Sequence, residues 1–181
     1  AAMGVRRGDR VGLYLNNSVE AVVGVFAIAK AGAVFVFVNP TTKREKLHYV
    51  LNNCRASALI ADARADLSGL LEDTNRAVPS LAGVILCGPT AAATKFGARC
   101  LAFEAALSQG VATCPAREGV DLDLACLIYT SGTTGDPKGV MSDNSNVVFA
   151  ASAIIEYLEN VESDIVINVL PLSFDYGLYQ L

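Results

Sequence analysis

Histidine, paired cysteines and charged side chains are all scarce in this chain of 181 residues. His48 is the only histidine, which argues against a Ser–His or Cys–His catalytic pair. No two cysteines form a Cys-x-x-Cys pair, so a zinc site is not expected either. Charged residues make up 18% of the chain and the net charge is −4, which leaves no basic stripe for a nucleic-acid backbone. We therefore expect no nucleic-acid partner.

The cysteines are isolated from one another in the sequence. They are Cys54, Cys87, Cys100, Cys114 and Cys126. Isolated thiols in a chain without a recognisable signal peptide are typical of a reducing compartment, where they lie buried and reduced. The sequence thus predicts a cytoplasmic protein.

Apolar residues account for 52% of the chain, and one apolar run, Ala21 to Val38, is long enough to suggest a membrane span. We reject a span because Lys30 would lie in mid-bilayer, and because the pattern changes from helical to strand-like within the run. The run predicts a helix from Glu20 to Ala31 that ends at Gly32, and then a strand from Val34 to Val38. No transmembrane segment is expected.

The same alternation of strands and helices runs along the whole chain. Arg10 to Leu15 reads as a strand, and Asn17 or Ser18 as the N-cap of the first helix. Thr42 and Glu45 form a capping box for the second helix, whose basic neighbours Lys43, Arg44 and Lys46 are interpreted as a solvated face. Further strands are predicted at Ala58 to Ala61, Leu81 to Leu86, Leu124 to Tyr129, Val140 to Met141 and Asp164 to Leu170. Gly88 to Gly97 reads as a surface loop, and Arg117 to Gly119 as a linker.

Asn144 or Ser145 is expected to cap a last long helix that runs to about Leu158. Strands alternating with helices indicate an α/β fold, with a layered, largely parallel sheet flanked by helices.

The most distinctive segment follows the apolar run that ends at Tyr129. It offers hydroxyls, flexible glycines and one ammonium group, from Thr130, Ser131, Gly132, Thr133, Thr134, Gly135 and Lys138. Together with Gly139, the glycines would allow positive φ and turn N–H groups toward an anion, while Pro137 would help to aim the lysine. This composition predicts a loop that binds a polyphosphate.

Two other phosphate-binding loops do not fit. The Walker pattern needs Gly-Lys-Ser/Thr, whereas Lys138 lies between Pro137 and Gly139, and the Gly-x-Gly-x-x-Gly spacing is absent. The segment instead resembles the signature loop of the adenylate-forming superfamily, which includes acyl-CoA ligases, the adenylation domains of peptide synthetases, and luciferases. The resemblance extends to Lys30–Ala33 with Val38–Pro40 upstream, and to Leu170–Leu178 downstream.

The resemblance implies that residues 1–181 form the N-terminal portion of a longer AMP-binding domain. The later motifs of the family are missing, including the adenine-binding Tyr-Gly-x-Thr-Glu, the ribose-binding aspartate and the catalytic lysine of the C-terminal lid. Ala1 at the start and an uncapped apolar segment before Leu181 also suggest a truncated chain. We therefore expect no complete catalytic site and no adenylation by these residues alone.

In the family, a carboxylate attacks the α-phosphorus of MgATP, and the acyl-adenylate then passes to a thiol of CoA or of a carrier protein. The resemblance thus implies ATP, Mg²⁺ and CoA as cofactors or co-substrates and a small carboxylic acid as substrate. It does not identify which residues would bind the metal. Because the chain is rich in apolar residues and poor in charged ones, we expect it to expose apolar faces that the rest of a longer protein would cover. We therefore expect the chain on its own to self-associate.

The segment Leu170–Leu178 resembles the substrate-pocket motif of the family, and we call it the pocket motif. Phe174, Asp175 and Gly177 are its expected substrate-pocket residues, but the chain departs from the family pattern at two positions. Phe174 stands where relatives often have a gating histidine, and Asn144 stands where many have histidine after the loop. In amino-acid-adenylating domains an aspartate like Asp175 binds the α-ammonium group, whereas Asp-x-Gly-Leu also resembles fatty-acyl ligases. Alternatively, Asp175 only caps the coming helix. We favour an acyl substrate, with an amino acid, or a non-catalytic nucleotide-binding relative, as alternatives.

Overall fold

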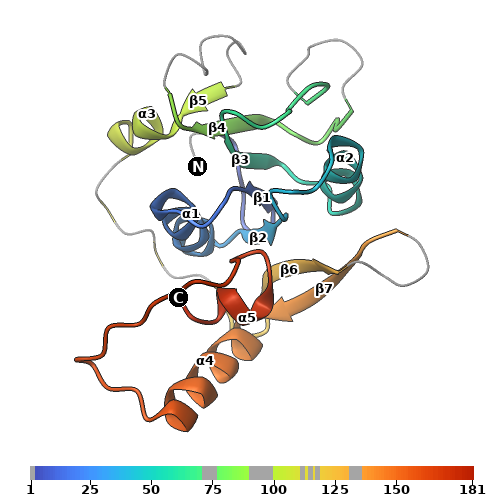
Figure 1. The fold of residues 1–181 in the computed structure, drawn as a ribbon. Helices are drawn as coiled ribbons and strands as arrows, with labels where there is room; N and C mark the ends of the chain where they lie inside the picture. The colour runs from blue at the N-terminus through green and yellow to red at the C-terminus, as the bar shows by residue number, and fades with distance from the viewer. Residues whose placement is uncertain are drawn as a thin grey trace.

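The strands form one mixed sheet in the computed structural model, which describes residues 3–70, 77–89, 100–110, 113, 116, 119–130 and 136–181 (Figure 1). The strand order is β5-β4-β3-β1-β2-β6-β7. All neighbours pair in parallel except β6 and β7, which are antiparallel. The prediction of a largely parallel α/β sheet is confirmed.

The bounds of the strands are β1 (Arg10–Tyr14), β2 (Val34–Phe37), β3 (Ala58–Asp62), β4 (Gly83–Cys87), β5 (Cys100–Ala102), β6 (Leu124–Thr130) and β7 (Lys138–Asp143). The helices are α1 (Val19–Lys30), α2 (Arg44–Asn53), α3 (Phe103–Ser108), α4 (Asn144–Leu158) and α5 (Asp175–Leu178). Most predicted strands appear within one or two residues of their expected bounds. The strand expected at Val140 to Met141 is longer than predicted, because it pairs along the whole of β6.

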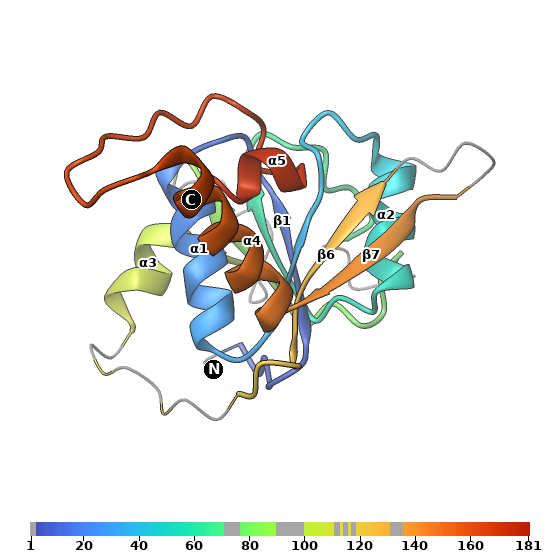
Figure 2. The same cartoon turned by 90° about the horizontal axis from the view of Figure 1, so that it is seen from below.

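Helices cover both faces of the sheet, as Figure 1 shows for α1 and α3 on one side and α2 on the other. Each face carries its own apolar cluster, one built on α2 and the other on α1. All four residues of β2 are buried, which is the pattern of a strand covered on both faces. Figure 2 shows α4 on the same side of the sheet as α1, and Val147 of α4 packs against the α1 cluster.

The apolar run from Ala21 to Val38 divides between helix and strand, as predicted. Ser18 is the N-cap of α1, and its Oγ accepts a hydrogen bond from the Ala21 N–H at 3.2 Å. Gly32, just after the helix, has a φ of +68°, which glycine adopts without strain. Within the described ranges, no helix is both long and apolar enough to cross a membrane.

The capping box predicted for α2 is wrong. The N-cap position belongs to Lys43, whose side chain makes no capping hydrogen bond. Thr42 lies one residue earlier, in a turn where its N–H donates to the Asn39 carbonyl at 2.9 Å and its own carbonyl accepts from the Tyr14 hydroxyl at 2.6 Å. This turn and the tyrosine hold Thr42 outside the helix, so the local sequence signal was overridden by tertiary contacts.

The N-cap predicted for α4, Asn144 or Ser145, is also wrong. Asp143 is the N-cap, and its Oδ1 accepts from the Asn146 N–H at 2.8 Å and from the Ser145 hydroxyl at 2.7 Å. Asn144 is the first residue of the helix, and its side chain has a different role, described below.

The strand predicted at Asp164 to Leu170 does not form. The segment has no regular secondary structure, and Ile165 and Ile167 are 98% and 78% exposed. The sheet ends at β7, so no neighbouring strand supplies backbone partners. The loop predicted at Gly88 to Gly97 and the linker at Arg117 to Gly119 lie mostly outside the described residues.

Candidate functional site

Strands β6 and β7 position the two ends of the predicted phosphate loop. Thr130 ends β6, Lys138 begins β7, and the two residues are direct cross-strand partners. Directly opposed residues of an antiparallel pair project their side chains to the same face, so the hydroxyl and the ammonium group share one face. The other predicted phosphate-binding residues, Ser131, Gly132, Thr133, Thr134 and Gly135, lie outside the described residues.

The pairing of β6 with β7 contains a β-bulge near its base. Leu124 pairs with Asp143 and Cys126 pairs with Ser142, so Ala125 is one extra residue in β6. Above this point the register is unbroken up to Thr130 and Lys138. A bulge bends a strand and increases its local twist, and it therefore affects the direction in which the loop end of this pair points.

The expectation that Gly139 has a positive φ is wrong. Among the described glycines, positive φ values occur elsewhere, and Gly139 is an ordinary strand residue opposite Tyr129. A Cβ added to Gly139 would lie 3.1 Å from Cζ and 3.2 Å from Cε2 of the Tyr129 ring. Glycine leaves room for the aromatic ring, which a Cβ at this position would crowd.

Tyr129 itself is held on the α2 side of the sheet. Its hydroxyl donates to Oδ1 of Asn53 at 2.5 Å. Burial, with smaller contributions from Cys54 and Tyr49, raises the pKa of Tyr129 to about 12, so the phenol stays protonated and acts as a hydrogen-bond donor. Sequence reasoning did not single out this residue, because its role depends on contacts with a distant helix.

The predicted pocket residues divide into exposed and buried positions. Phe174 is the N-cap residue of α5 and is exposed, with no capping hydrogen bond from its side chain. Asp175 is the first helical residue, also exposed, and its Oδ1 accepts from the Tyr176 N–H at 3.0 Å. Gly177 is buried, and a Cβ there would collide with the Pro171 carbonyl oxygen. Gly177 thus allows α5 to pack closely against the Pro171 carbonyl.

A cavity of about 550 Å³ is lined by residues that flank the predicted phosphate loop and by residues of the segment Leu170–Leu178. Its lining includes Thr130, Pro137, Ser173, Phe174, Lys43 and Lys46. Among the predicted site residues, Thr130 and Phe174 are therefore brought together, whereas Lys138, Asp175 and Gly177 are not part of the lining. The basic cluster of α2 is exposed, as predicted, but two of its lysines also border this cavity, which sequence reasoning missed.

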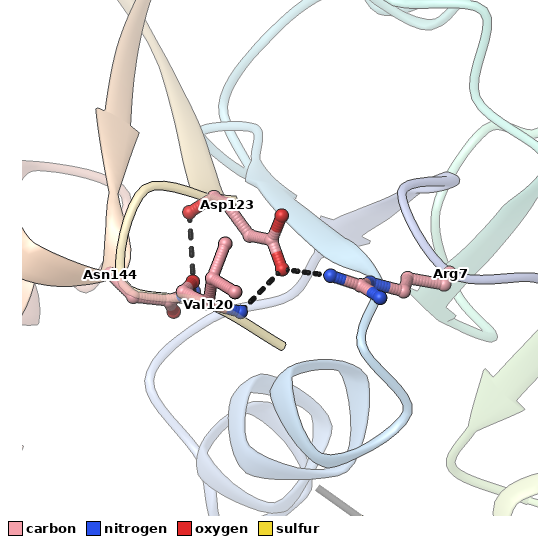
Figure 3. Close-up of polar contacts among 4 residues, drawn as sticks. All are labelled: Arg7, Val120, Asp123 and Asn144. Carbon is pink, nitrogen blue, oxygen red and sulfur yellow. Dashed lines mark hydrogen bonds and ion pairs between the residues drawn. The ribbon is translucent and has the colours of Figure 1, made fainter. Parts of the chain in front are cut away.

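Asn144 joins the start of α4 to the start of β6, as Figure 3 shows. Its Nδ2 donates to the carbonyl of Asp123 at 3.1 Å and to that of Val120 at 3.4 Å, and its backbone N–H also donates to the Asp123 carbonyl, at 3.0 Å. The Asp123 carboxylate accepts from the Val120 N–H at 2.9 Å and from the Arg7 guanidinium at 2.5 Å. These donors lower the pKa of Asp123, the Val120 N–H most and the Arg7 side chain next.

The donor set around the loop fits a polyphosphate better than a bound metal. Thr130 and Lys138 are both exposed, so a hydroxyl donor and a cation on one face remain accessible to an anion. No cluster of three or more metal-ligating side chains occurs among the residues that the structure describes. The described residues therefore assign no Mg²⁺ ligand.

Comparison with known proteins identifies the family. The AMP-binding enzyme family matches residues 1–181, so the chain belongs to this family. A linear gramicidin synthase polypeptide of Brevibacillus parabrevis is 32% identical over 180 residues, which are 99% of this chain and 2% of the relative. The 4-hydroxybenzoate–CoA/benzoate–CoA ligase of Rhodopseudomonas palustris is 30% identical over 178 residues, which are 98% of this chain and 32% of the relative.

The fold is also shared with solved structures. The crystal structure of a long-chain-fatty-acid-CoA ligase from Archaeoglobus fulgidus matches 99% of this chain and 34% of its own chain, with a TM-score of 0.80 and 23% identity. At this identity the match supports the fold alone, and it confirms the predicted adenylate-forming fold. The chain spans only a minor part of each of these relatives.

Proposed function

We propose that residues 1–181 are the N-terminal portion of an enzyme that uses ATP to activate a carboxylic acid as an acyl-adenylate and then transfers the acyl group to a thiol of CoA or a carrier protein. Membership of the AMP-binding enzyme family supports the activation step. The observation that carries the proposal is the cross-strand pair of Thr130 and Lys138, which presents a hydroxyl and a cation on one face at the two ends of the loop.

In this proposal the chain's residues bind and orient the triphosphate. Lys138 and the Thr130 hydroxyl donate to the β- and γ-phosphate oxygens, together with the loop residues Ser131 to Gly135. Mg²⁺, when bound with ATP, neutralises the phosphate charge that develops as pyrophosphate leaves. Such a reaction needs positioned donors rather than a protein nucleophile, which agrees with the single histidine of the chain.

We propose an acyl substrate rather than an amino acid. Asp175 does not line the cavity, and its carboxylate already accepts from the adjacent Tyr176 N–H. Phe174, which borders the cavity, presents an apolar surface to a substrate.

The second candidate is an amino-acid adenylation domain. The Phe174–Asp175 pair and the identity to a linear gramicidin synthase favour it. Pyrophosphate exchange on the complete protein separates the candidates, with medium-chain, long-chain and aromatic acids in one set and the proteinogenic amino acids in the other. Exchange that depends only on amino acids would overturn the acyl assignment. No exchange with any acid would favour a non-catalytic relative.

The role of Lys138 is tested by its replacement with alanine in the complete protein. One lost hydrogen bond to a charged phosphate is worth about 1.5 to 3 kcal/mol, so Lys138→Ala should weaken MgATP binding about 10- to 150-fold in titration calorimetry. Lys30→Ala is the matched control, because Lys30 is an exposed lysine in the last turn of α1. Equal MgATP affinity in wild type and Lys138→Ala would remove this role. We further propose that residues 1–181 alone form no acyl-adenylate.

A further inference from the structure

The base of the β6–β7 pair is fastened by side chains that the proposed reaction does not use. Asn144 spans from the first turn of α4 to two carbonyls just before β6, those of Val120 and Asp123. Asp123 in turn accepts from Arg7, which belongs to the segment before β1 (Figure 3). We call Asn144, Asp123 and Arg7 the base clamp. It connects three parts of the chain that are far apart in sequence.

The base clamp holds the strands in a register that differs from the register near the loop. At the base, Asp143 pairs with Leu124, and the clamp fixes Asn144 next to Asp123 in the same alignment. From Cys126 to Thr130 the alignment is shifted by one residue, and the extra residue Ala125 absorbs the shift. A continuous ladder in the upper alignment would instead place Asn144 opposite Leu124, where the contact with the Asp123 carbonyl is lost.

The upper alignment has its own fixed point. The ring of Tyr129 lies over Gly139, and a residue with a Cβ would not fit there without movement of the ring. The pair therefore has two anchors in different registers, with the bulge held between them. Because bulges bend strands and re-aim the side chains beyond them, this arrangement sets the twist of the segment that ends in Thr130 and Lys138.

We propose that Asn144 is a positioning residue for nucleotide binding: through the base clamp it maintains the bulge at Ala125, and thereby aims Lys138 and Thr130 at the phosphates. This inference rests on the proposed function of the loop. It assigns a role to Asn144 other than helix capping, which Asp143 performs. Without the amide, the ladder can become continuous and the loop end of the pair changes its twist.

The test is a double-mutant cycle in the complete protein, with Asn144→Ala, Lys138→Ala and the double variant. Calorimetry gives the MgATP dissociation constant, and pyrophosphate exchange gives the KM values for ATP and for the acid. We expect Asn144→Ala to weaken MgATP binding at least about fivefold, with little change in the KM for the acid. In the Lys138→Ala background the same substitution should have a clearly smaller effect, because the part that acts through the lysine is already lost and only the part that acts through Thr130 remains.

Asn160→Ala is the matched control, since Asn160 follows the other end of α4 and its amide donates a hydrogen bond only to the nearby Asp164 carboxylate among the described residues. Asn144→His, which keeps an N–H donor, should bind MgATP more tightly than Asn144→Ala. If Asn144→Ala fails to fold, Asn144→His and Arg7→Met provide milder losses for the same cycle.

The outcomes separate the inference from the function on which it rests. If Lys138→Ala binds MgATP like wild type, the proposed role of the loop lysine fails. If Lys138→Ala weakens binding but Asn144→Ala does not, or if the two effects are additive, the positioning role of Asn144 is overturned while the proposed function stands. A lower thermal midpoint with unchanged KM values would also overturn it, because that is the result of a purely structural role.

Discussion

Gly139 offers a direct test of whether a glycine after the phosphate loop is required for its backbone conformation or for space. In the structure Gly139 is a β-strand residue without positive φ, and a Cβ would approach the Tyr129 ring to 3.1 Å. The ring cannot withdraw freely, because its hydroxyl is bonded to Asn53. We therefore expect Gly139→Ala to be destabilising through crowding, and only through crowding.

The magnitude follows from two opposing effects. Inserting a methyl group into a packed contact costs about 1 to 3 kcal/mol. Replacing glycine by alanine at a permitted conformation returns about 0.4 to 1 kcal/mol, because the unfolded chain loses freedom. The difference between these ranges is a net loss of up to about 2.5 kcal/mol, measurable as a lower midpoint of urea unfolding followed by circular dichroism.

To test whether the ring contact is the cause, Gly139→Ala is also made in a Tyr129→Val background. Valine removes the ring and keeps a strand-forming side chain. In that background Gly139→Ala should stabilise the protein by about 0.4 to 1 kcal/mol, because only the effect on the unfolded chain remains. If alanine is equally destabilising in both backgrounds, the ring contact is not the reason. Gly139 would then be needed for its backbone conformation, as the sequence alone suggested.

Two further predictions concern the cap of α4 and the buried thiols. Asp143→Ala should lower the thermal midpoint by about 2 to 4 °C, whereas Asp143→Asn retains most of the cap. Hydrogen bonds from the Ser145 side chain and then from the Asn146 N–H lower the pKa of Asp143 in the folded protein. The stabilising effect of Asp143 is therefore present above the unfolded-state pKa and is lost as the pH falls through the folded-state pKa. The difference in thermal midpoint between wild type and Asp143→Ala should shrink in acid. Burial raises the pKa of Cys126 to about 11, so in the folded protein iodoacetamide should label Cys126 more slowly than the half-buried Cys100, and equal labelling by mass spectrometry would contradict this.

Local sequence signals predicted much of the fold. Ser18, one of the two predicted N-caps, does cap α1, and the apolar residues that follow the helix form the buried strand β2. The same signals failed at α4, where Asp143, Asn144 and Ser145 are three competent capping residues in succession. The Asn144 side chain donates instead to the carbonyls of Val120 and Asp123, which are distant in sequence, and Asp143 caps the helix.

The sequence proposes residues for the candidate site but does not give its geometry. Thr130 and Lys138, at the two ends of the predicted loop, are cross-strand partners. The lining of the cavity by Lys43 and Lys46 depends on how α2 lies beside β6, which no local pattern encodes. The same holds for Gly177, whose need for space arises from the carbonyl of Pro171.

The segment around Ile165 shows why a strand cannot always be predicted from its own residues. Ile165, Val166 and Ile167 are apolar on both alternating faces, which is typical of a strand covered on two sides, yet all three are exposed. A strand exists only with a partner that accepts and donates its backbone hydrogen bonds, and β7 already forms the edge of this sheet. The edge strand β7 also exposes Val140 and Met141. Apolar side chains gathered beyond an open sheet edge are the physical reason to expect that residues 1–181 associate with further polypeptide, either the remainder of the proposed enzyme or, when isolated, another copy of the chain.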